Sequence, residues 1–287
     1  MNKKILILGG DLRQLAVADE FKKEGYEVSF FGFEKCEHPI PYYIYNTLSD
    51  ALEENKIIIL GMPVSRDGIH LNSPFSDFTI KLSDIFQASG KGKKIFGGIL
   101  PDGFSDKGIK KGPEFFDYGK KEELIIKNVI PTVEGAIKIA IENTPFTLHS
   151  SRILICGFGR IGKLLAKNLT ALGARVTVSA RKPEDMAWIE CYGYKKVKTC
   201  HIFEAINKFD IIFNTIPAPV IDEECLKRVK KNALIIDLAS GSGGVDFKYA
   251  RLLDINVIRA LSLPGLVAYE TAGKIIKETI IDILKGK

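Results

Sequence analysis

Short apolar runs alternate with amphipathic stretches along the first hundred residues. The amphipathic stretches carry apolar residues at helical spacing, at 12–23, 49–54 and 78–88. The apolar runs between them are rich in Ile, Leu, Val and Phe, at 5–8, 26–33, 56–64 and 93–100. Such runs are typical of buried strands, and their alternation with helices predicts βαβ units around a mostly parallel sheet.

Residues 101–121, PDGFSDKGIKKGPEFFDYGKK, break this rhythm. They are rich in Gly, Lys and Asp and show no clear periodicity. Segments of this kind inside compact domains are often lids or binding loops, while a solvated crossover explains the composition equally well.

The alternation resumes further along the chain. Apolar residues on one face predict a long helix that begins near Pro131 or Thr132 and ends near 143, since proline is favourable in a first helical turn. A second α/β series extends from Arg152 to about Arg259, and a last amphipathic helix covers 271–285. The pattern predicts two Rossmann-like, doubly wound α/β domains with mostly parallel sheets, joined by interdomain helices.

Composition narrows the function classes only slightly. The chain has 287 residues, 46% of them hydrophobic and 26% charged, and a net charge of +6 without a basic run. This balance favours a small polyanionic ligand over nucleic acid. No apolar run reaches the roughly 18 residues of a membrane span, and the N-terminal run is too short for a signal peptide.

The cysteines indicate a reducing, cytoplasmic environment. There are five, scattered and without a CxxC pair. Cys200 and His201 are adjacent, but neighbouring side chains diverge on regular elements, so we expect no metal site.

The stretch RILICGFGRIGKLLAKNL has the features of a dinucleotide-binding turn. The strand 152–156 is followed by a full GxGxxG motif that opens a helix. The first glycine permits the tight turn, the second lets the backbone approach a pyrophosphate, and the third allows close helix–strand packing. Backbone amides at the helix N-terminus add donors for the phosphates. The predicted contacts are Gly157, Gly159, Arg160, Ile161 and Gly162.

The end of the next strand distinguishes between nucleotides. NAD sites usually place a carboxylate there to accept a hydrogen bond from the ribose 2′-hydroxyl. This chain instead has Ser179, Arg181 and Lys182, which suit a 2′-phosphate, so we expect NADP(H). The alternative is that Arg181 and Lys182 are ordinary surface charges.

Two further strands end where the other wall of the crevice is expected. Ligands of open α/β sheets bind beyond the carboxyl ends of the strands. Asn214, Thr215 and Pro217 follow the strand 211–213 and are candidates for the nicotinamide side, or plain turn residues. A Gly/Ser-rich loop from Ala239 follows the next strand.

The first strand of the chain also ends in a glycine turn, but with different contents. Gly9 and Gly10 are followed by Asp11, which would repel a pyrophosphate, and by Arg13, whose guanidinium forms a two-donor fork for a carboxylate. Ser65 and Arg66 repeat the arrangement after the third strand. We expect a small anionic compound here; the alternative is a surface arginine paired with its neighbouring aspartate. Of four histidines, His38 is the best placed for proton transfer.

Four motifs resemble the dipicolinate synthase A-subunit family: GGDLRQ at 9–14, NVIPTVEGAI at 128–137, GFGRIG at 157–162 and ALSLPGLVAYETAG at 260–273. They cover nearly the whole chain in order, and the first and last are far more specific than the glycine fingerprint. Tyr269 departs from the proline that is expected in the last motif.

The resemblance implies oxidation of a dihydrodipicolinate-type intermediate to pyridine-2,6-dicarboxylate during sporulation, with NADP⁺ accepting hydride. It also implies a flavoprotein-like partner, the B-subunit of dipicolinate synthase. A small dicarboxylate substrate accounts for the arginine-bearing turns, and association into a homo-oligomer is compatible with this picture. We expect a substrate-binding domain from 1–127 and 270–287, an interdomain helix and linker at 128–150, and an NADP-binding domain at 151–269.

Three further residues gain expected roles from the resemblance. Pro264 precedes the final helix and is expected to close the crevice near the cofactor. Thr132 and Glu134 lie at the predicted helix start, within reach of substrate. Glu134 is a candidate base, although an acid that complements the helix dipole is the favoured interpretation.

Two other functions remain open. A D-2-hydroxyacid-type dehydrogenase shares the layout but needs a histidine late in the nucleotide domain, and none follows His201. The other is a non-catalytic NADP-binding regulatory or scaffold protein, whose partner performs the chemistry.

Overall fold

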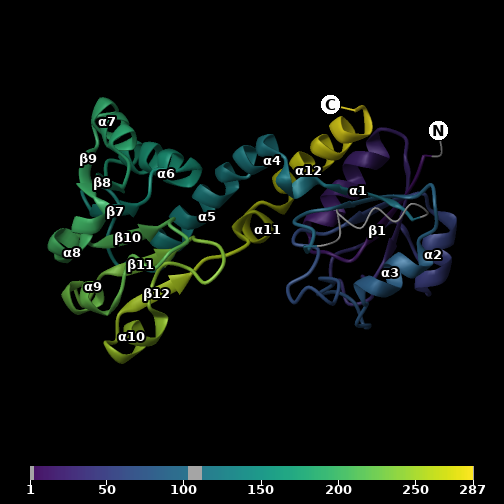
Figure 1. Cartoon of the computed structure of the whole chain (residues 1–287), viewed down its shortest axis with the longest axis horizontal. Helices are drawn as coiled ribbons and strands as arrows, with labels where there is room; N and C mark the ends of the chain where they lie inside the picture. Colours follow the sequence, from purple (N-terminus) through teal and green to yellow (C-terminus); the bar gives the residue numbers. More distant parts are fainter. Residues whose placement is uncertain (1–2, 103–111, 287) are drawn as a thin grey trace. The chain divides into compact units, whose positions relative to one another are not determined.

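The structure, a computed structural model, describes residues 3–102 and 112–286. The chain divides into two compact units (Figure 1). The first comprises Met1–Asn128 and Ala268–Lys287, and the second comprises Val129–Val267.

The first unit is built on a six-stranded, wholly parallel sheet. The strand order is β3-β2-β1-β4-β5-β6, which is the doubly wound order. Strands are added on one side of β1 up to β3 and then on its other side from β4, so the switch point lies between β1 and β4. Its strands are β1 (Lys4–Leu8), β2 (Glu27–Phe31), β3 (Tyr43–Ile44), β4 (Ile57–Leu60), β5 (Lys94–Gly97) and β6 (Glu114–Asp117). Its helices are α1 (Arg13–Lys23), α2 (Leu48–Glu54), α3 (Leu82–Ala88), the 3₁₀ helix η1 (Tyr118–Lys120), α4 (Glu122–Lys127) and α12 (Tyr269–Leu284).

Both faces of the first sheet are covered, which explains the continuous apolar runs. Ile5 and Ile7 of β1 pack in one cluster with side chains of α1 and α12. Leu6 and Leu8 belong to a second cluster that includes residues of α2 and α3. Alternate side chains of a strand therefore meet helices on opposite faces, as a parallel sheet requires.

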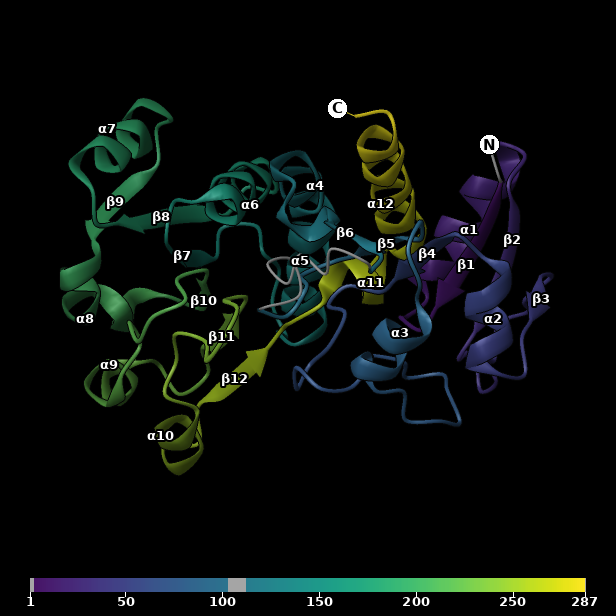
Figure 2. The same cartoon turned by 45° about the vertical axis from the view of Figure 1, so that its right-hand side comes forward.

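The second unit repeats the same topology in another six-stranded, wholly parallel sheet. The order β12-β11-β10-β7-β8-β9 is again doubly wound about its first strand, β7. The strands are β7 (Arg152–Cys156), β8 (Arg175–Ala180), β9 (Lys195–Lys198), β10 (Ile211–Asn214), β11 (Leu234–Asp237) and β12 (Asn256–Arg259). The helices, of which Figure 2 gives a second view, are α5 (Val129–Glu142), α6 (Arg160–Ala171), α7 (Pro183–Cys191), η2 (Thr199–His201), α8 (Ile202–Ala205), η3 (Ile206–Lys208), α9 (Glu223–Arg228), α10 (Phe247–Leu252) and α11 (Leu263–Val267).

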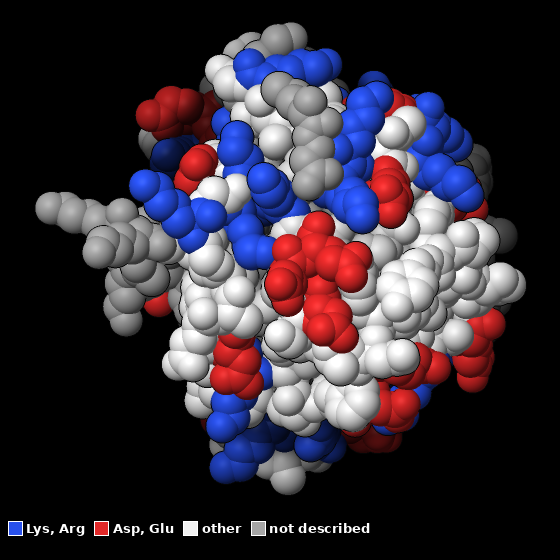
Figure 3. All heavy atoms as spheres, turned by 90° about the vertical axis from the view of Figure 1, so that its right-hand side faces the viewer, with Lys and Arg blue, Asp and Glu red and all other residues white. Residues whose placement is uncertain are grey.

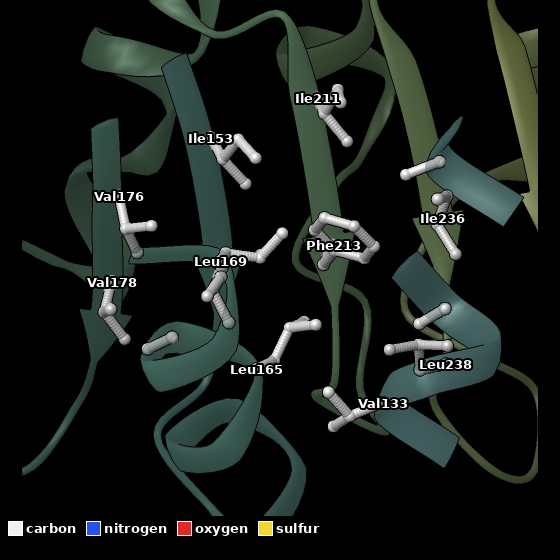
Figure 4. Packing of buried hydrophobic residues seen from close by; sticks show 14 of the residues in the cluster. Val133, Ile153, Leu165, Leu169, Val176, Val178, Ile211, Phe213, Ile236 and Leu238 are labelled. Carbon is white, nitrogen blue, oxygen red and sulfur yellow. The ribbon is translucent and has the colours of Figure 1, made fainter. Parts of the chain in front are cut away.

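The sheet of the second unit is packed on both faces, with one core cluster against α5 and α6 and another that includes residues of α8, α9 and α10. Figure 4 shows Ile153, Val176 and Phe213 directed from three neighbouring strands to one side, where Leu165 and Leu169 of α6 meet them. The prediction of two doubly wound α/β domains with mostly parallel sheets is therefore confirmed.

The segment 101–121 contains more regular structure than its composition predicts. Residues 103–111 lie outside the described residues, but β6 forms the edge of the first sheet and η1 follows it. The ring of Phe116 stacks on Phe96 of β5 with centroids 4.9 Å apart. The prediction of an irregular loop is wrong at 114–120, because a four-residue edge strand is too short to show alternation among charged neighbours.

The helix predicted to start at Pro131 or Thr132 begins earlier, at Val129, directly after α4 and the single residue Asn128. Pro131 has no N–H to bond the carbonyl of Lys127, and its ring crowds that carbonyl, so helices α4 and α5 are separated at Asn128. Helix α5, which the sequence analysis assigned to an interdomain segment, belongs to the second unit. The final helix and Ala268 belong to the first.

Helices α1 and α12 approach closely at a glycine. A Cβ atom at Gly273 would lie 2.5 Å from the carbonyl oxygen of Arg13 and 2.6 Å from Cβ of Ala16. The contact brings the last helix against the helix that follows the first strand, so the two ends of the chain contribute to one unit.

We expect Gly273→Ala to destabilise the first unit by about 1–3 kcal/mol, because overpacking against backbone atoms outweighs the better helix propensity of alanine. Hydrogen exchange of the α1 and α12 amides measures this change. The control is Gly90→Ala, since an added Cβ at Gly90 meets nothing within 4 Å. Unchanged protection in Gly273→Ala would contradict the packing described.

Candidate functional site

The three glycines of the second unit's first turn have three distinct surroundings. Gly157 has a φ of +100°, and a Cβ there would lie 2.5 Å from Oγ1 of Thr215. A Cβ at Gly162 would overlap the carbonyl oxygen of Gly157, so α6 packs directly on the turn. A Cβ at Gly159 meets nothing within 4 Å. Protein packing requires the first and third glycines, whereas the second borders open space.

The N-terminus of α6 faces this turn with its amides uncapped by a side chain. Gly159 is the N-cap residue and makes no side-chain hydrogen bond. The first N–H groups of an α-helix have no partner within the helix and carry its positive dipole end, which suits an anion. Ile161 packs its side chain against the core, so its amide is what it offers a ligand.

A groove of about 750 Å³ opens beside the turn. Seven of the predicted cofactor residues line it, namely Gly157, Gly159, Arg160, Arg181, Lys182, Thr215 and Pro217. Phe158, Lys163, Ala180, Asp185, Thr199, Ile216, Ala218 and Val220 complete the lining, and the sequence analysis did not select them. Lys163 is the fourth residue of α6, and its Nζ lies 5.3 Å from the centroid of the Phe158 ring. Its position in the first turn of the helix that follows the glycine motif was the signal from which it could have been predicted as a groove residue.

Ser179 does not reach the groove. The residue is fully buried in β8, where the amide of Gly157 lies 3.4 Å from its hydroxyl oxygen and donates to it. The prediction that Ser179 contacts the ribose phosphate is therefore corrected: its hydroxyl supports the glycine turn from behind.

Asn214 is also fully buried and forms a network with Asp237 on the adjacent strand. The two residues pair in register at the ends of β10 and β11, and Nδ2 of Asn214 donates to Asp237 at 2.7 Å. Asp237 also accepts hydrogen bonds from the amides of Ala239 and Gly244. Asn214 thus positions the loops that carry Thr215 and Pro217 instead of contacting a ligand.

Asp237 is a functional-site residue that was not predicted from the sequence. A carboxylate that ends the apolar run LIID, in register with an asparagine on the next strand, was the available signal. The groove wall at 215–218 depends on this buried pair, because the amide of Ile216 donates to the side-chain oxygen of Asn214 at 3.2 Å.

Pro264, Thr132 and Glu134 do not line this groove. Pro264 is half-buried in α11, which packs on α5 around Gly135. Thr132 is half-buried and Glu134 is exposed. Because α5 begins at Val129, Glu134 lies beyond the first turn, and the interpretation that it complements the helix dipole is wrong.

The glycine turn of the first unit is closed by the chain itself. The amide of Gly9 donates to the carbonyl oxygen of Phe31 at 3.0 Å, and the amide of Gly10 donates to the carbonyl oxygen of Asn72 at 2.8 Å. A Cβ at Gly9 would lie 2.7 Å from Cδ2 of Leu71. The segment 71–73 therefore occupies the space above the turn that a phosphate would need.

Asp11 and Arg13 complete this closure. Nε and Nη2 of Arg13 donate to the two carboxylate oxygens of Asp11 at 2.8 and 2.7 Å, and Nη2 also donates to the carbonyl oxygen of Met62. Arg13 is only 4% exposed. The prediction of an arginine presented to a soluble anion is corrected to a buried pair.

Burial by itself would lower the pKa of Arg13, but the hydrogen bonds and charge of Asp11 raise it above its usual value. The guanidinium therefore stays charged. Asp11 also accepts a hydrogen bond from the amide of Arg13 at 3.1 Å, which uses a donor at the start of α1.

Ser65 and Arg66 differ in what they present. Ser65 is held in a turn, donating to Asp67 at 3.0 Å and accepting from the amide of Gly68. Hydrogen bonds from the backbone and side chain of His70 hold the pKa of Asp67 well below its usual range. Arg66 is exposed and has no ion-pair partner among residues 3–102 and 112–286.

His38 lies in a different groove of the first unit, of about 590 Å³. Residues of α1, of the loop that follows β2 and of α12 line it, and none of Gly9, Arg13 or Ser65 does. The His38 ring is 6.0 Å from that of Tyr269. His38 is exposed. The groove that it lines does not include the other residues that were predicted to bind the substrate.

Charge over the first unit is mixed. Figure 3 shows Lys and Arg interspersed with clusters of Asp and Glu, not a single basic field. No helix within the described ranges is long and apolar enough to cross a membrane. The described residues also hold no group of three or more His, Cys, Asp or Glu side chains suited to a metal ion.

The second unit's glycine turn, uncapped helix and groove define a dehydrogenase-type, dinucleotide-binding α/β protein. Its residues 134–263 match the family model of the D-isomer specific 2-hydroxyacid dehydrogenase NAD binding domain. Residues 4–118 match the N-terminal domain of the dipicolinate synthase A-subunit. The nicotinamide cofactor class follows from the first match together with the turn.

Relatives of the whole chain specify the family. The chain is 32% identical to the dipicolinate synthase A-subunit of Bacillus subtilis (strain 168) over 98% of its own length and 95% of the relative's. The crystal structure of the Bacillus halodurans A-subunit is 28% identical, with a TM-score of 0.87 over 99% and 98% of the two chains. The Bacillus subtilis structure is 31% identical, with a TM-score of 0.84 over 100% and 97%. The chain belongs to the dipicolinate synthase A-subunit family.

The glycine surroundings predict opposite effects of two alanine substitutions. Gly159→Ala should weaken dinucleotide binding at least about tenfold, by blocking the close approach of the pyrophosphate, and should change stability by less than about 0.5 kcal/mol. Gly162→Ala should lower the free energy of unfolding by about 1–3 kcal/mol. Urea unfolding followed by Trp188, the single tryptophan, and calorimetric binding measure the two effects. Equal destabilisation by both would contradict the geometry.

The buried pair of the first unit predicts a double-mutant result. Asp11→Ala leaves the Arg13 charge buried without its carboxylate, so we expect a loss of about 3 kcal/mol in the unfolding free energy of this unit. Adding Arg13→Met should restore part of that loss, because the uncompensated charge is removed. Hydrogen exchange of the α1 amides measures both variants. Additive losses in the double variant would show that the pair does not act as a unit.

Proposed function

We propose that this chain uses NADP⁺ to oxidise a dihydrodipicolinate-type intermediate to dipicolinate, pyridine-2,6-dicarboxylate. Family membership supports the reaction, and the groove of the second unit supports the cofactor. The observation that carries the choice of NADP is the pair of exposed cations, Arg181 and Lys182, at the groove end of β8.

The cation pair is free to meet a phosphate. Within the described part of the chain, neither Arg181 nor Lys182 has an ion-pair partner, and both line the groove. No carboxylate occurs at 179–182, where an NAD site would use one for the ribose 2′-hydroxyl. Arg181 also offers a planar face on which an adenine ring stacks.

The rest of the groove suits the other parts of the cofactor. The amides of Arg160 and Ile161 at the start of α6 are donors for the pyrophosphate, and Lys163 adds a positive charge on the same helix. Thr215 and Pro217, held in place by Asn214 and Asp237, form the wall on the nicotinamide side. The bound nicotinamide supplies the hydride acceptor.

For this reaction the main task of the protein is to position the substrate next to the nicotinamide ring. Loss of hydride and a proton from a dihydropyridine yields an aromatic ring, so the reaction is favourable without a strong base. Glu134 and His38 are both exposed, and we propose each as a site of proton exchange only if the substrate still carries a hydroxyl group that must leave as water. Arg66, exposed and unpaired among the described residues, is the proposed ligand of a substrate carboxylate in the first unit.

We place the chain with a flavoprotein-like B-subunit in the cytoplasm of a sporulating cell, since its relatives carry the name of one component of a larger synthase. A non-catalytic, NADP-binding protein is the competing function. A D-2-hydroxyacid-type dehydrogenase is disfavoured, because no histidine lines the second unit's groove among the described residues. His201 lies on η2, is exposed and pairs with Glu204 at 2.9 Å.

The reaction is tested by generating the dihydro compound in situ from its aldehyde and keto-acid precursors. Dipicolinate and reduced cofactor are followed together, with the flavoprotein-like partner absent and then present. Equal amounts of both products from this chain alone are expected. Product only after the partner is added would favour the non-catalytic function, and tight NADP⁺ binding without product in either mixture would remove the substrate assignment.

Cofactor preference is tested with Arg181→Ala/Lys182→Ala. Loss of charge-assisted hydrogen bonds should weaken NADP⁺ binding about 10- to 100-fold and change NAD⁺ binding less than about threefold. Arg175→Ala/Lys195→Ala is the charge-matched control, since both cations are exposed at the opposite ends of β8 and β9. Parallel losses for NADP⁺ and NAD⁺ would count against a 2′-phosphate contact.

A further inference from the structure

The end of the edge strand β9 lies beside the proposed phosphate-binding cations. In the register of β8 and β9, Ala180 pairs with Lys198, so Arg181 and Thr199 directly follow paired positions. A second groove, of about 610 Å³, is lined by Arg181, Lys198 and Thr199. It shares Ala180, Arg181, Thr199 and Val220 with the first groove, so the two meet at this point.

Thr199 carries a polar atom that the described structure leaves without a partner. Its Oγ1 is buried and makes no hydrogen bond. Thr199 lines both grooves, and a rotation about χ1 exchanges the positions of a threonine hydroxyl and its neighbours on Cβ. A buried hydroxyl without a partner is unfavourable, so an acceptor that arrives in the groove favours this rotation.

Lys198 differs from the neighbouring lysines of the same strand. Lys196 pairs with Glu190. Lys198 is exposed, lines the second groove and has no ion-pair partner in the described ranges. Lys195 is also exposed and without an ion-pair partner in those ranges, but it lies at the other end of β9 and lines neither groove.

We propose that Lys198 and Thr199 form the second half of the site for the adenosine 2′-phosphate, opposite Arg181 and Lys182. Thr199 donates its hydroxyl hydrogen to a phosphate oxygen, and Lys198 supplies a third positive charge. The inference rests on the proposed use of NADP(H), and it adds the last residue of β9 and the first residue of η2 to a phosphate site predicted from the sequence only at the end of β8.

The site also explains why the lysine-rich edge strand β9 ends in Lys198 and is followed directly by Thr199. Lysines on an edge strand discourage pairing with another chain, and this role suffices for Lys195 and Lys196. It does not require a hydroxyl whose oxygen is buried, nor a lysine that faces a groove.

Calorimetric titration with 2′,5′-ADP and with AMP tests the proposal without turnover. The two probes share adenosine and its 5′-phosphate and differ in the 2′-phosphate. Thr199→Val should weaken 2′,5′-ADP about 10-fold, because a hydrogen bond to a charged acceptor is lost. Lys198→Ala should weaken it about 3- to 10-fold, with a smaller effect at high salt. AMP binding should change less than about twofold in both, which is within the range of surface substitutions.

Two matched variants accompany these. Thr199→Ser keeps the hydroxyl and should retain affinity for 2′,5′-ADP, whereas Lys195→Ala removes an equal charge outside the grooves and should have no effect. Equal loss of 2′,5′-ADP and AMP in Thr199→Val would place the hydroxyl at the adenine or ribose and overturn the proposal. If Lys195→Ala weakens 2′,5′-ADP binding as much as Lys198→Ala does, Lys198 acts only through the general positive charge of the surface. That result would overturn its assignment to the phosphate site.

Binding of 2′,5′-ADP and AMP to the wild-type chain tests the proposed use of NADP(H) separately from the roles of Lys198 and Thr199. If it binds 2′,5′-ADP no better than AMP, the proposed use of NADP(H) is wrong along with its extension to β9. If it discriminates and Arg181→Ala/Lys182→Ala removes the discrimination, while Thr199→Val and Lys198→Ala leave it intact, only the extension is wrong.

Discussion

Backbone amides that follow the first strand of a doubly wound sheet need acceptors, and much of this molecule depends on how each unit supplies them. The first glycine amide has an internal acceptor in both units, since Gly9 donates to the carbonyl oxygen of Phe31 and Gly157 to that of Ser179. In the first unit the second glycine, Gly10, also has one, the carbonyl oxygen of Asn72. In the second unit α6 starts at Arg160, after the N-cap residue Gly159, without a side-chain cap and beside a groove. The same strand order therefore leads to a closed turn in one case and an open turn in the other.

The closed turn depends on the long connection between β4 and α3. That connection brings Leu71 and Asn72 over the glycines, and the fork of Arg13 joins Asp11 to the Met62 carbonyl at its start. The aspartate that would repel a pyrophosphate serves as the counter-ion of a buried arginine. A residue that is unfavourable for one ligand is therefore a structural requirement of the turn that replaces it.

Sequence patterns predicted the sheets well, because buried parallel strands leave continuous apolar runs and a glycine turn has fixed spacing. They could not separate polar residues that face a ligand from those bonded within the protein. Ser179, Asn214 and Arg13 all lie at or just after strand ends, where ligands bind, and all three are buried. Asp237 escaped notice because its partner, Asn214, is distant in sequence and becomes adjacent only through strand pairing. Thr199 was not predicted for the same reason, since it comes near Arg181 only through the pairing of β8 with β9.

The carbonyl oxygen of Asn72 takes the place of a ligand oxygen at the Gly10 amide, and it is covalently attached to the same chain. A tethered group has an effective concentration set by the chain, in the range of about millimolar or higher when the linker is short and well held. The connection that holds Asn72 is fixed further, since its amide donates to Val64 and its side chain to Pro63. In the described part of the chain, the turn of the first unit is thereby closed to a pyrophosphate, and the proposed dinucleotide site is the groove of the second unit. If the chain uses NADP(H) as proposed, its response to the ratio of oxidised to reduced cofactor is set by binding at the groove of the second unit.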